Sequence, residues 1–94
     1  MNRSRVYLSG AISLNASSAT EQFSHAERIF LSRGYEVFNP ITTDEMSYHE
    51  YLKIDLAELL KCTHICYVND VETSKGAFIE HMIAEACKIE EITL

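Results

Sequence analysis

One stretch of the chain, from Ser74 to Ala84, combines a candidate anion site with a candidate reactive carboxylate. Ser74 fits a helix N-cap, Lys75 adds positive charge, and Gly76 lets a ligand approach the first helical turn closely. The free N–H groups at a helix start favour an anion such as a phosphate. Glu80 follows one turn later, and its neighbours at helical spacing are mostly small residues. The spacing therefore predicts a phosphorylated substrate with a reactive carbon near the Glu80 carboxylate.

A second carboxylate, Asp55, lies at the margin of a leucine-rich helical stripe. Its neighbours at helical spacing are Tyr51, Leu52 and Leu59. A carboxylate that lies half inside an apolar boundary tends to have a raised pKa. The residues alone leave two simpler interpretations open, in which Asp55 is a solvated helix carboxylate and Glu80 is a surface residue of an amphipathic helix.

Other residues that could do chemistry carry weaker signals. Tyr7 lies in an apolar strand and is most simply a core residue. The loop Ser9-Gly10-Ala11-Ile12-Ser13 follows that strand, and small loops at this position are common in α/β proteins. Three histidines have no obvious carboxylate or serine partner in the sequence, and we expect them on the surface: His25, His49 and His81.

The cysteines raise the question of a metal site. Cys62, His64 and Cys66 alternate like residues on one face of a strand, a spacing that could hold a metal ion. No fourth ligand is evident, so the simpler interpretation buries Cys66 in a central strand and ends a helix at Cys62. An odd number of cysteines without a signal peptide favours the reducing cytoplasm.

The composition is that of one soluble globular domain over residues 1–94, with 47% apolar and 23% charged residues. The formal net charge of −6 argues against nucleic-acid binding driven by phosphate attraction. An anionic ligand therefore needs a local site. No apolar run approaches the roughly 20 residues of a membrane span, so we expect no membrane partner.

Helix signals and apolar runs alternate along the chain. Ser18 with Glu21 forms a capping-box pattern, and Gly34 predicts the end of the helix that follows. Ser47 with Glu50 forms a second capping box. It opens a helix whose expected apolar face is Leu52, Leu56, Leu59 and Leu60. A third helix is expected over residues 74–88, and strands are expected at residues 6–8, 35–38, 63–68 and 91–94.

This alternation predicts an α/β fold, a flavodoxin- or Rossmann-like three-layer sandwich. The short parallel sheet would have about four strands with helices on both faces. Ligands of such sheets bind outside the carboxyl ends of the strands. The loops at residues 9–17 and 69–74 would flank that crevice, which places the segment from Ser74 to Glu80 beside a ligand.

Three short motifs occur in an order and spacing that resembles the nucleoside 2-deoxyribosyltransferase superfamily. They are Tyr7-Leu8-Ser9-Gly10-Ala11-Ile12, Ile54-Asp55-Leu56 and Ser74-Lys75-Gly76-Ala77-Phe78-Ile79-Glu80. The serine-containing form of the last motif is most similar to 2′-deoxynucleoside 5′-monophosphate N-glycosidases. The segment Gly34-Tyr35-Glu36-Val37-Phe38-Asn39-Pro40 resembles small phage and bacterial members of uncharacterised activity. The resemblance spans nearly the whole chain.

The resemblance implies a role for each matching residue. Glu80 matches the family nucleophile, Asp55 the acid that assists the base and sugar, and Tyr7 the tyrosine near the nucleophile. The substrate- and phosphate-binding residues expected on this basis are Ser9, Gly10, Ala11, Ile12, Ser13, Ser74, Lys75 and Gly76. Three positions depart from the family pattern: an arginine is replaced by Ser13, a second aspartate by Ser74, and an aspartate before the third strand by Thr63.

The implied activity is cleavage or exchange of the N-glycosidic bond of a 2′-deoxynucleoside 5′-monophosphate through a covalent glycosyl–Glu80 intermediate. No cofactor or metal is implied. The implied partners are a deoxynucleotide or nucleoside and further copies of the chain in a homodimer or higher homo-oligomer, because relatives can complete their site across subunits. Two other classes remain open, a non-catalytic nucleotide-binding module on the same fold and a small interaction protein without a ligand.

Overall fold

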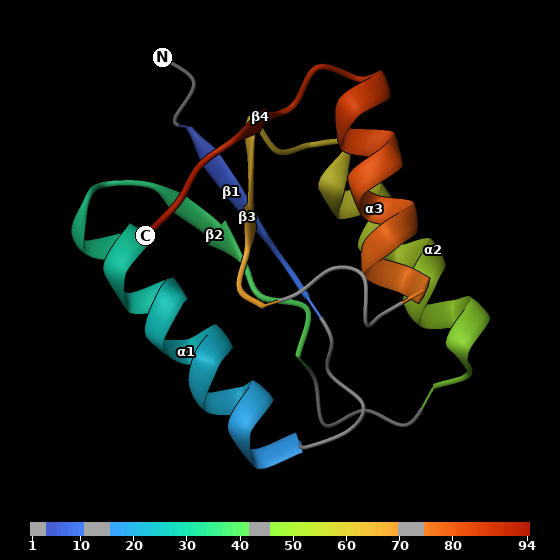
Figure 1. The fold of residues 1–94 in the computed structure, drawn as a ribbon, viewed down its shortest axis with the longest axis horizontal. Helices are drawn as coiled ribbons and strands as arrows, with labels where there is room; N and C mark the ends of the chain where they lie inside the picture. The colour runs from blue at the N-terminus through green and yellow to red at the C-terminus, as the bar shows by residue number, and fades with distance from the viewer. Residues whose placement is uncertain (1–3, 11–15, 42–45, 70–74) are drawn as a thin grey trace.

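The computed structural model describes residues 4–10, 16–41, 46–69 and 75–94 of the chain (Figure 1). Strands and helices alternate along it in the order that the sequence predicts. Their bounds are β1 Arg5–Ser9, α1 Ala16–Ser32, β2 Glu36–Phe38, α2 Tyr48–Leu59, β3 His64–Tyr67, α3 Lys75–Ala86 and β4 Glu90–Glu91.

All strand pairs in the sheet are parallel, and the strand order is β2-β1-β3-β4. Helix α1 covers one face of the sheet, while α2 and α3 cover the other face (Figure 1). The predicted flavodoxin- or Rossmann-like sandwich with helices on both faces is confirmed. Because β1 lies between β2 and β3, its side chains have neighbours on both sides and on both faces of the sheet.

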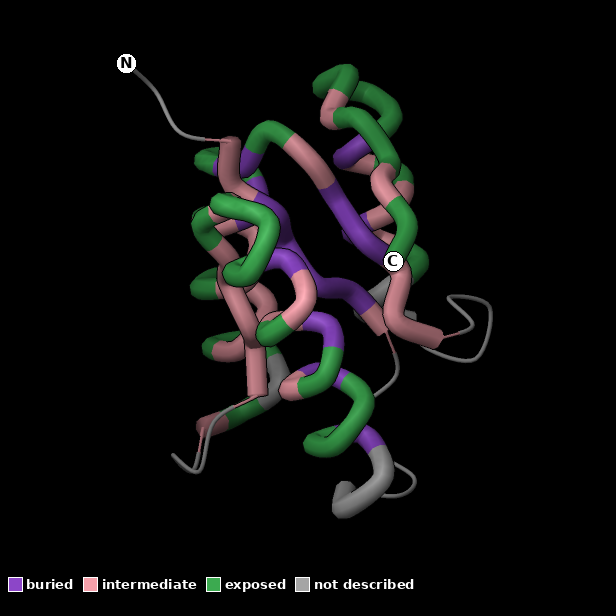
Figure 2. The backbone as a smooth tube through the Cα atoms, turned by 90° about the vertical axis from the view of Figure 1, so that its left-hand side faces the viewer, coloured by how far each residue is buried: buried purple, intermediate pink, exposed green. Residues whose placement is uncertain are grey.

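Alternate side chains of β1 enter two separate cores, because successive residues of a strand point to opposite faces. Val6 and Leu8 pack on the α1 side with Phe23 and Phe30. Tyr7 packs on the other side, in a cluster with Leu59, Cys62, Ile65 and Ala84. Figure 2 shows the buried segments gathered in the central strands and on the inward turns of the helices.

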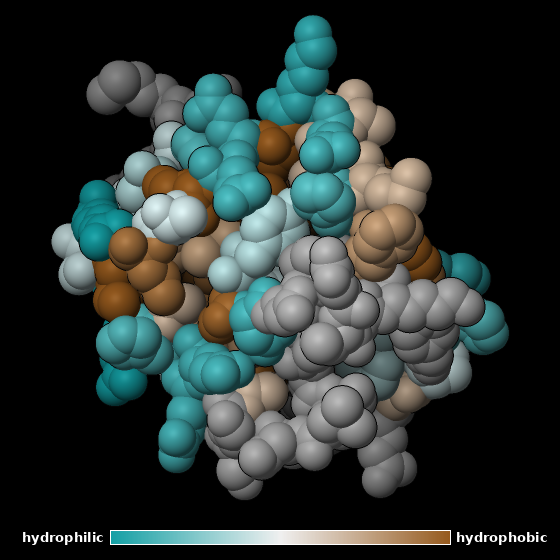
Figure 3. Space-filling view, in the orientation of Figure 1, coloured by the Kyte–Doolittle hydropathy of each residue, from teal (hydrophilic) through white to brown (hydrophobic). Residues whose placement is uncertain are grey.

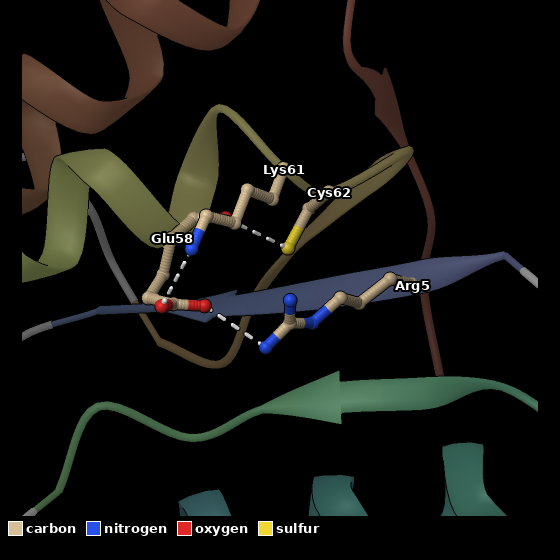
Figure 4. Close-up of polar contacts among 4 residues, drawn as sticks. All are labelled: Arg5, Glu58, Lys61 and Cys62. Atoms are coloured by element: carbon tan, nitrogen blue, oxygen red, sulfur yellow. Dashed lines mark hydrogen bonds and ion pairs between the residues drawn. The ribbon is translucent and has the colours of Figure 1, made fainter.

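The amino end of the sheet is tied to the end of α2 by charged side chains (Figure 4). Arg5 Nη2 lies 2.9 Å from Glu58 Oε2, and Lys61 Nζ lies 3.5 Å from Glu58 Oε1. The Cys62 thiol donates to the Glu58 carbonyl oxygen at 3.3 Å. One carboxylate therefore has two cations beside it where α2 turns into β3.

Two local predictions are wrong, and one is confirmed. Helix α1 begins at Ala16, so Ser18 lies inside the helix; Asn15, another good capping residue type, directly precedes α1 and competes with Ser18 as a start signal. Leu60 is 60% exposed because α2 ends at Leu59, and its N–H caps the last turn. Ser47 does cap α2, accepting a hydrogen bond from the Glu50 N–H.

The surface mixes polar and apolar side chains. Figure 3 shows polar residues interspersed with smaller apolar patches on the face in view. Within the described residues, none of the helices combines the length and the apolar character that crossing a bilayer requires.

Candidate active site

The centre of the candidate site is the carboxylate of Glu80, which projects from α3 toward β1. The residue is only 6% exposed. The Tyr7 hydroxyl donates to Oε2 at 2.7 Å, and the Ser9 hydroxyl donates to Oε1 at 2.7 Å. Tyr7 and Ser9 are two residues apart on one strand, so they share a face of the sheet and reach both carboxylate oxygens. The interpretation of Glu80 as a surface residue is therefore wrong.

A small residue next to Glu80, Ala84, serves the packing of α3. Ala84, one turn after Glu80, is 1% exposed and belongs to the same core cluster as Tyr7 and Leu59. A methyl side chain at this position lets the helix approach the sheet closely enough for Glu80 to reach the β1 hydroxyls. This small neighbour therefore brings Glu80 against two donors.

Opposing effects act on the pKa of Glu80. Burial raises the pKa of its carboxyl above the usual value, and the hydrogen bonds from Tyr7 and Ser9, which favour the charged form, offset this only in part. Burial and the nearby negative charge of Glu80 raise the pKa of Tyr7 far above its usual value. Tyr7 therefore keeps its proton and remains a donor to Glu80.

Asp55 on α2 is the second acid of the site. The residue is half-buried, and burial together with the negative charge of Glu80 raises the pKa of Asp55 to about 7. The raised pKa that the apolar margin predicts is confirmed, and the fully solvated alternative is wrong. None of the salt bridges in the described part of the chain involves Asp55 or Glu80. Near neutral pH this pair can therefore hold one proton and one negative charge.

The segments that leave β1 and β3 meet at the carboxyl end of the sheet, as the fold predicts. Gly10 has a φ of +156°, and a Cβ on it would lie 2.6 Å from Asn69 Oδ1. Asn69 Nδ2 donates to Gln22 Oε1 on α1 at 3.2 Å. The sequence predicts only that Asn69 begins a loop, so its position over Gly10 is a structural finding.

Most of the expected phosphate contacts cannot be placed. Ala11, Ile12, Ser13 and Ser74 lie outside the described residues, as do the side-chain environments of Lys75 and Gly76. Helix α3 begins at Lys75, which agrees with the helix start that the sequence predicts. The phosphate site therefore stays a prediction.

His81 has partners that the sequence interpretation missed. His81 Nδ1 lies 2.7 Å from the Tyr67 hydroxyl, and His81 Nε2 lies 3.3 Å from Glu85 Oε1. His25 and His49 are exposed, as expected. The spacing of four residues between His81 and Glu85 on one helix is the signal that could have revealed half of this arrangement.

Cys62 and Cys66 belong to the cores on opposite faces of the sheet, so these two thiols cannot share a metal ion. Cys66 is buried in the core on the α1 side, whereas Cys62 is buried on the α2 and α3 side. Among the described residues, no group of three or more ligating side chains could hold a metal. Burial raises the pKa of each thiol to about 11, which keeps both protonated and unreactive.

Comparison with known proteins gives one family. Residues 4–93 match the family described as "Domain of unknown function (DUF4406)". No curated protein matches the chain at a significant level. The family match thus covers every described element, from β1 to β4.

Proposed function

This chain belongs to the DUF4406 family, and we propose that it cleaves or exchanges the N-glycosidic bond of a 2′-deoxynucleoside 5′-monophosphate. One observation carries the proposal. A buried carboxylate, Glu80, accepts hydrogen bonds from the hydroxyls of Tyr7 and Ser9 beside a second carboxylate, Asp55, whose pKa is raised to about 7. Enzymes that break glycosidic bonds commonly use two carboxyl groups in different environments, one as the general acid and the other as the nucleophile.

In the first step Glu80 is the nucleophile. One of its oxygens forms a bond to C1′ of the sugar while the bond from C1′ to the base nitrogen breaks, and the electron pair leaves with the base. Each carboxylate oxygen has two lone-pair sites, so an oxygen that accepts a hydrogen bond from a hydroxyl keeps a second lone pair for attack. The product is a glycosyl ester of Glu80.

Asp55 supplies the proton that the departing base needs. A pKa of about 7 leaves a large protonated fraction at neutral pH, which suits a general acid. After the base has left, the Asp55 carboxylate can take a proton from an attacking water. Attack at C1′ then breaks the ester bond and returns the electron pair to Glu80.

Tyr7 and Ser9 have a positioning and electrostatic role in this scheme. Their hydroxyls hold the Glu80 carboxylate in one orientation and stabilise its negative charge, both before attack and when it leaves the ester. A second base in place of water would give exchange instead of hydrolysis by the same two displacements, and retention at C1′ follows in both cases.

The 5′-phosphate is the sequence-based part of the proposal. Ser74, the N–H groups at the start of α3 and Lys75 would hold it by the helix dipole, worth roughly 0.3–2 kcal/mol, and by charge-assisted hydrogen bonds of about 1.5–3 kcal/mol. We therefore expect a monophosphate to bind about ten- to a thousandfold more tightly than its nucleoside. Calorimetric titration of a matched pair into the Glu80→Gln variant measures this ratio, and equal affinities would exclude the phosphate site.

The test of the activity is direct. The protein is incubated with a panel of 2′-deoxynucleoside 5′-monophosphates, and free base is separated by chromatography, with a second base added in parallel samples to detect exchange. We expect release from at least one member of the panel. Tight nucleotide binding without any release, even at enzyme concentrations near that of the substrate, would instead identify a non-catalytic nucleotide-binding module.

A further inference from the structure

A second polar chain lies beside Glu80 on the same face of the sheet. Tyr67 is the last residue of β3, and its hydroxyl lies 2.7 Å from Nδ1 of His81 on α3. The two rings meet edge to face, with centroids 5.5 Å apart. On its far side, His81 Nε2 lies 3.3 Å from Glu85 Oε1. The three side chains therefore form a continuous line from the carboxyl end of β3 to the outer surface of α3.

Two members of this line, His81 and Tyr67, are directly linked to residues of the candidate site. His81 directly follows Glu80 on α3. Tyr67 pairs in register with Ser9, the residue whose hydroxyl donates to Glu80. Two successive residues of α3 are thus hydrogen-bonded to two adjacent strands, Glu80 to β1 and His81 to β3.

Apolar packing does little to fix the outer side of this helical turn. Phe78 and Met82 flank Glu80 in the sequence, and they are 51% and 55% exposed. The hydrogen bond between Tyr67 and His81 is therefore a specific restraint on the turn that carries Glu80, on a side where burial supplies little.

We propose that Tyr67 and His81 are positioning residues, which hold the Glu80 carboxylate at its place against β1. The catalytic consequence rests on the proposed function, because it needs Glu80 to be the nucleophile. A nucleophile must be held close to its reactive geometry, and a displacement of about 1 Å can reduce a rate on the order of a hundredfold.

The protonation states agree with this role. If the Tyr67 hydroxyl donates to Nδ1, the imidazole carries its proton on Nε2, which then donates toward Glu85, so one neutral tautomer satisfies both contacts. Burial, and then the negative charges of Glu91, Glu85 and Glu80, raise the pKa of Tyr67 to about 12. Tyr67 therefore keeps its proton throughout the neutral range and can donate it in a hydrogen bond to His81.

Four variants separate positioning from general stability. Tyr67→Phe and His81→Leu each remove the hydrogen bond, and the double variant, which lacks both partners, loses only the same bond. His81→Asn keeps an acceptor at the place of Nδ1. Tyr35→Phe, which removes a hydroxyl from a ring that packs edge to face with Phe30 and His64, is the control. Circular dichroism selects folded proteins, and Tyr67→Phe with His81→Asn suffices if His81→Leu does not fold.

The kinetic expectation is a ten- to hundredfold loss of kcat for base release in Tyr67→Phe and His81→Leu, with KM nearly unchanged. The double variant should be no worse than either single variant, because both delete the same interaction. His81→Asn should recover most of the loss. Losses that multiply in the double variant, or a loss that appears equally in Tyr35→Phe, would overturn the proposal.

A second measurement does not need activity. The side-chain carboxyl carbon of Glu80 is followed by NMR during a pH titration. Its midpoint should move in Tyr67→Phe and stay in place in Tyr35→Phe, because only the first change loosens the contact with β1. An unchanged Glu80 titration in Tyr67→Phe overturns the positioning role. If the wild-type protein releases no base from any substrate, the proposed function fails by itself and this titration still decides the inference.

Discussion

Two carboxylates on α2, only three residues apart, lie in opposite electrostatic surroundings. Glu58 points to the amino end of the sheet, between Arg5 and Lys61 (Figure 4). Asp55 is half-buried near the negative charge of Glu80 and takes part in no salt bridge of the described part of the chain. The same helix therefore carries one acid, Glu58, whose charge is stabilised by nearby cations, and another, Asp55, whose charge is disfavoured by burial and by Glu80.

The surroundings of Glu58 favour stability of the fold, whereas those of Asp55 favour chemical reactivity. An ion pair such as that of Glu58 adds modestly to the free energy of unfolding. A carboxylate near a second carboxylate, away from water, destabilises the fold, and strained electrostatics of this kind are typical of functional sites. The charges at the amino end of the sheet therefore favour the folded state modestly, whereas the pair of Asp55 and Glu80 opposes it.

The largest expected difference between the two ends concerns activity. Glu80→Gln keeps the shape of the side chain and removes the nucleophile, so base release should fall by about 10⁴-fold or more. Glu58→Gln, which removes an acid of the same type from the amino end, should leave the rate nearly unchanged. Initial rates of base release are measured for both variants. A similar loss of rate in both would show that the two ends of the sheet do not differ in their role in catalysis.

Asp55 should matter less than Glu80, and in a pH-dependent way. Loss of a general acid usually reduces kcat by about 10²–10⁴-fold, and this is what we expect for Asp55→Asn. Because the protonated form is required and the pKa of Asp55 is raised to about 7, the wild-type rate should fall as the pH rises through about 7. The variant should lack this decrease, and a pH–rate profile that keeps it would assign the acid to another group.

Stability should change in opposite directions at the two ends. The folded-state pKa of Asp55 is raised, so the folded protein binds a proton that the unfolded chain releases, and stability falls as the pH rises from the usual carboxyl range to about 7. Asp55→Asn should therefore be the more stable protein at alkaline pH. Solvent screens a half-buried group, so we expect about 1 kcal/mol, which shrinks as the pH falls toward 4.

Glu58→Gln is the matched comparison. It should lose about 0.5–1 kcal/mol, and the loss should be smaller at high salt. Urea unfolding of the wild type and both variants, at acid and alkaline pH, measures the two effects. A destabilised Asp55→Asn at alkaline pH would contradict the electrostatic distinction between the ends.

The last comparison between the two ends concerns two glycines. Gly10 at the carboxyl end has Asn69 Oδ1 at 2.6 Å from an added Cβ, whereas Gly34 has a φ of +90° and nothing within 4 Å of an added Cβ. Gly34→Ala should cost about 1 kcal/mol of unfolding free energy from backbone strain alone. Gly10→Ala should cost about 1 kcal/mol more, because the Asn69 side chain must move as well. Equal losses of unfolding free energy in the two variants, measured by thermal unfolding, would show that the Asn69 side chain moves aside at no cost.

The order of the elements could be predicted because it depends on local patterns. Apolar runs, glycine stops and the Ser47 cap are short-range signals, and parallel strands with helical connections allow few topologies. The start of α1 could not be fixed, because Asn15 and Ser18 are both good capping types. Leu60 was misassigned because an apolar periodicity does not reveal where a helix ends.

The candidate site was only partly predictable, because its contacts join distant segments. The sequence places Glu80 at the ligand end of the sheet and Asp55 at the margin of an apolar stripe, but the hydrogen bond from Ser9 to Glu80 joins residues 71 positions apart. Whether Glu80 faces solvent or β1 depends on the distance between α3 and the sheet. The spacing of apolar residues along a helix does not predict that distance. The pair of Tyr67 and His81 was missed for the same reason, since one partner lies on a strand and the other on a helix.

The central claim is that Glu80 forms a covalent bond to the sugar. The most direct test mixes the protein with a deoxynucleoside monophosphate that it cleaves, quenches the reaction with acid within the first turnover, and maps peptides by mass spectrometry. We predict an added mass of one deoxyribose 5-phosphate residue on the peptide that contains Glu80, absent in Glu80→Gln. Base release by Glu80→Gln at the wild-type rate, or an adduct on a different residue, would contradict the account.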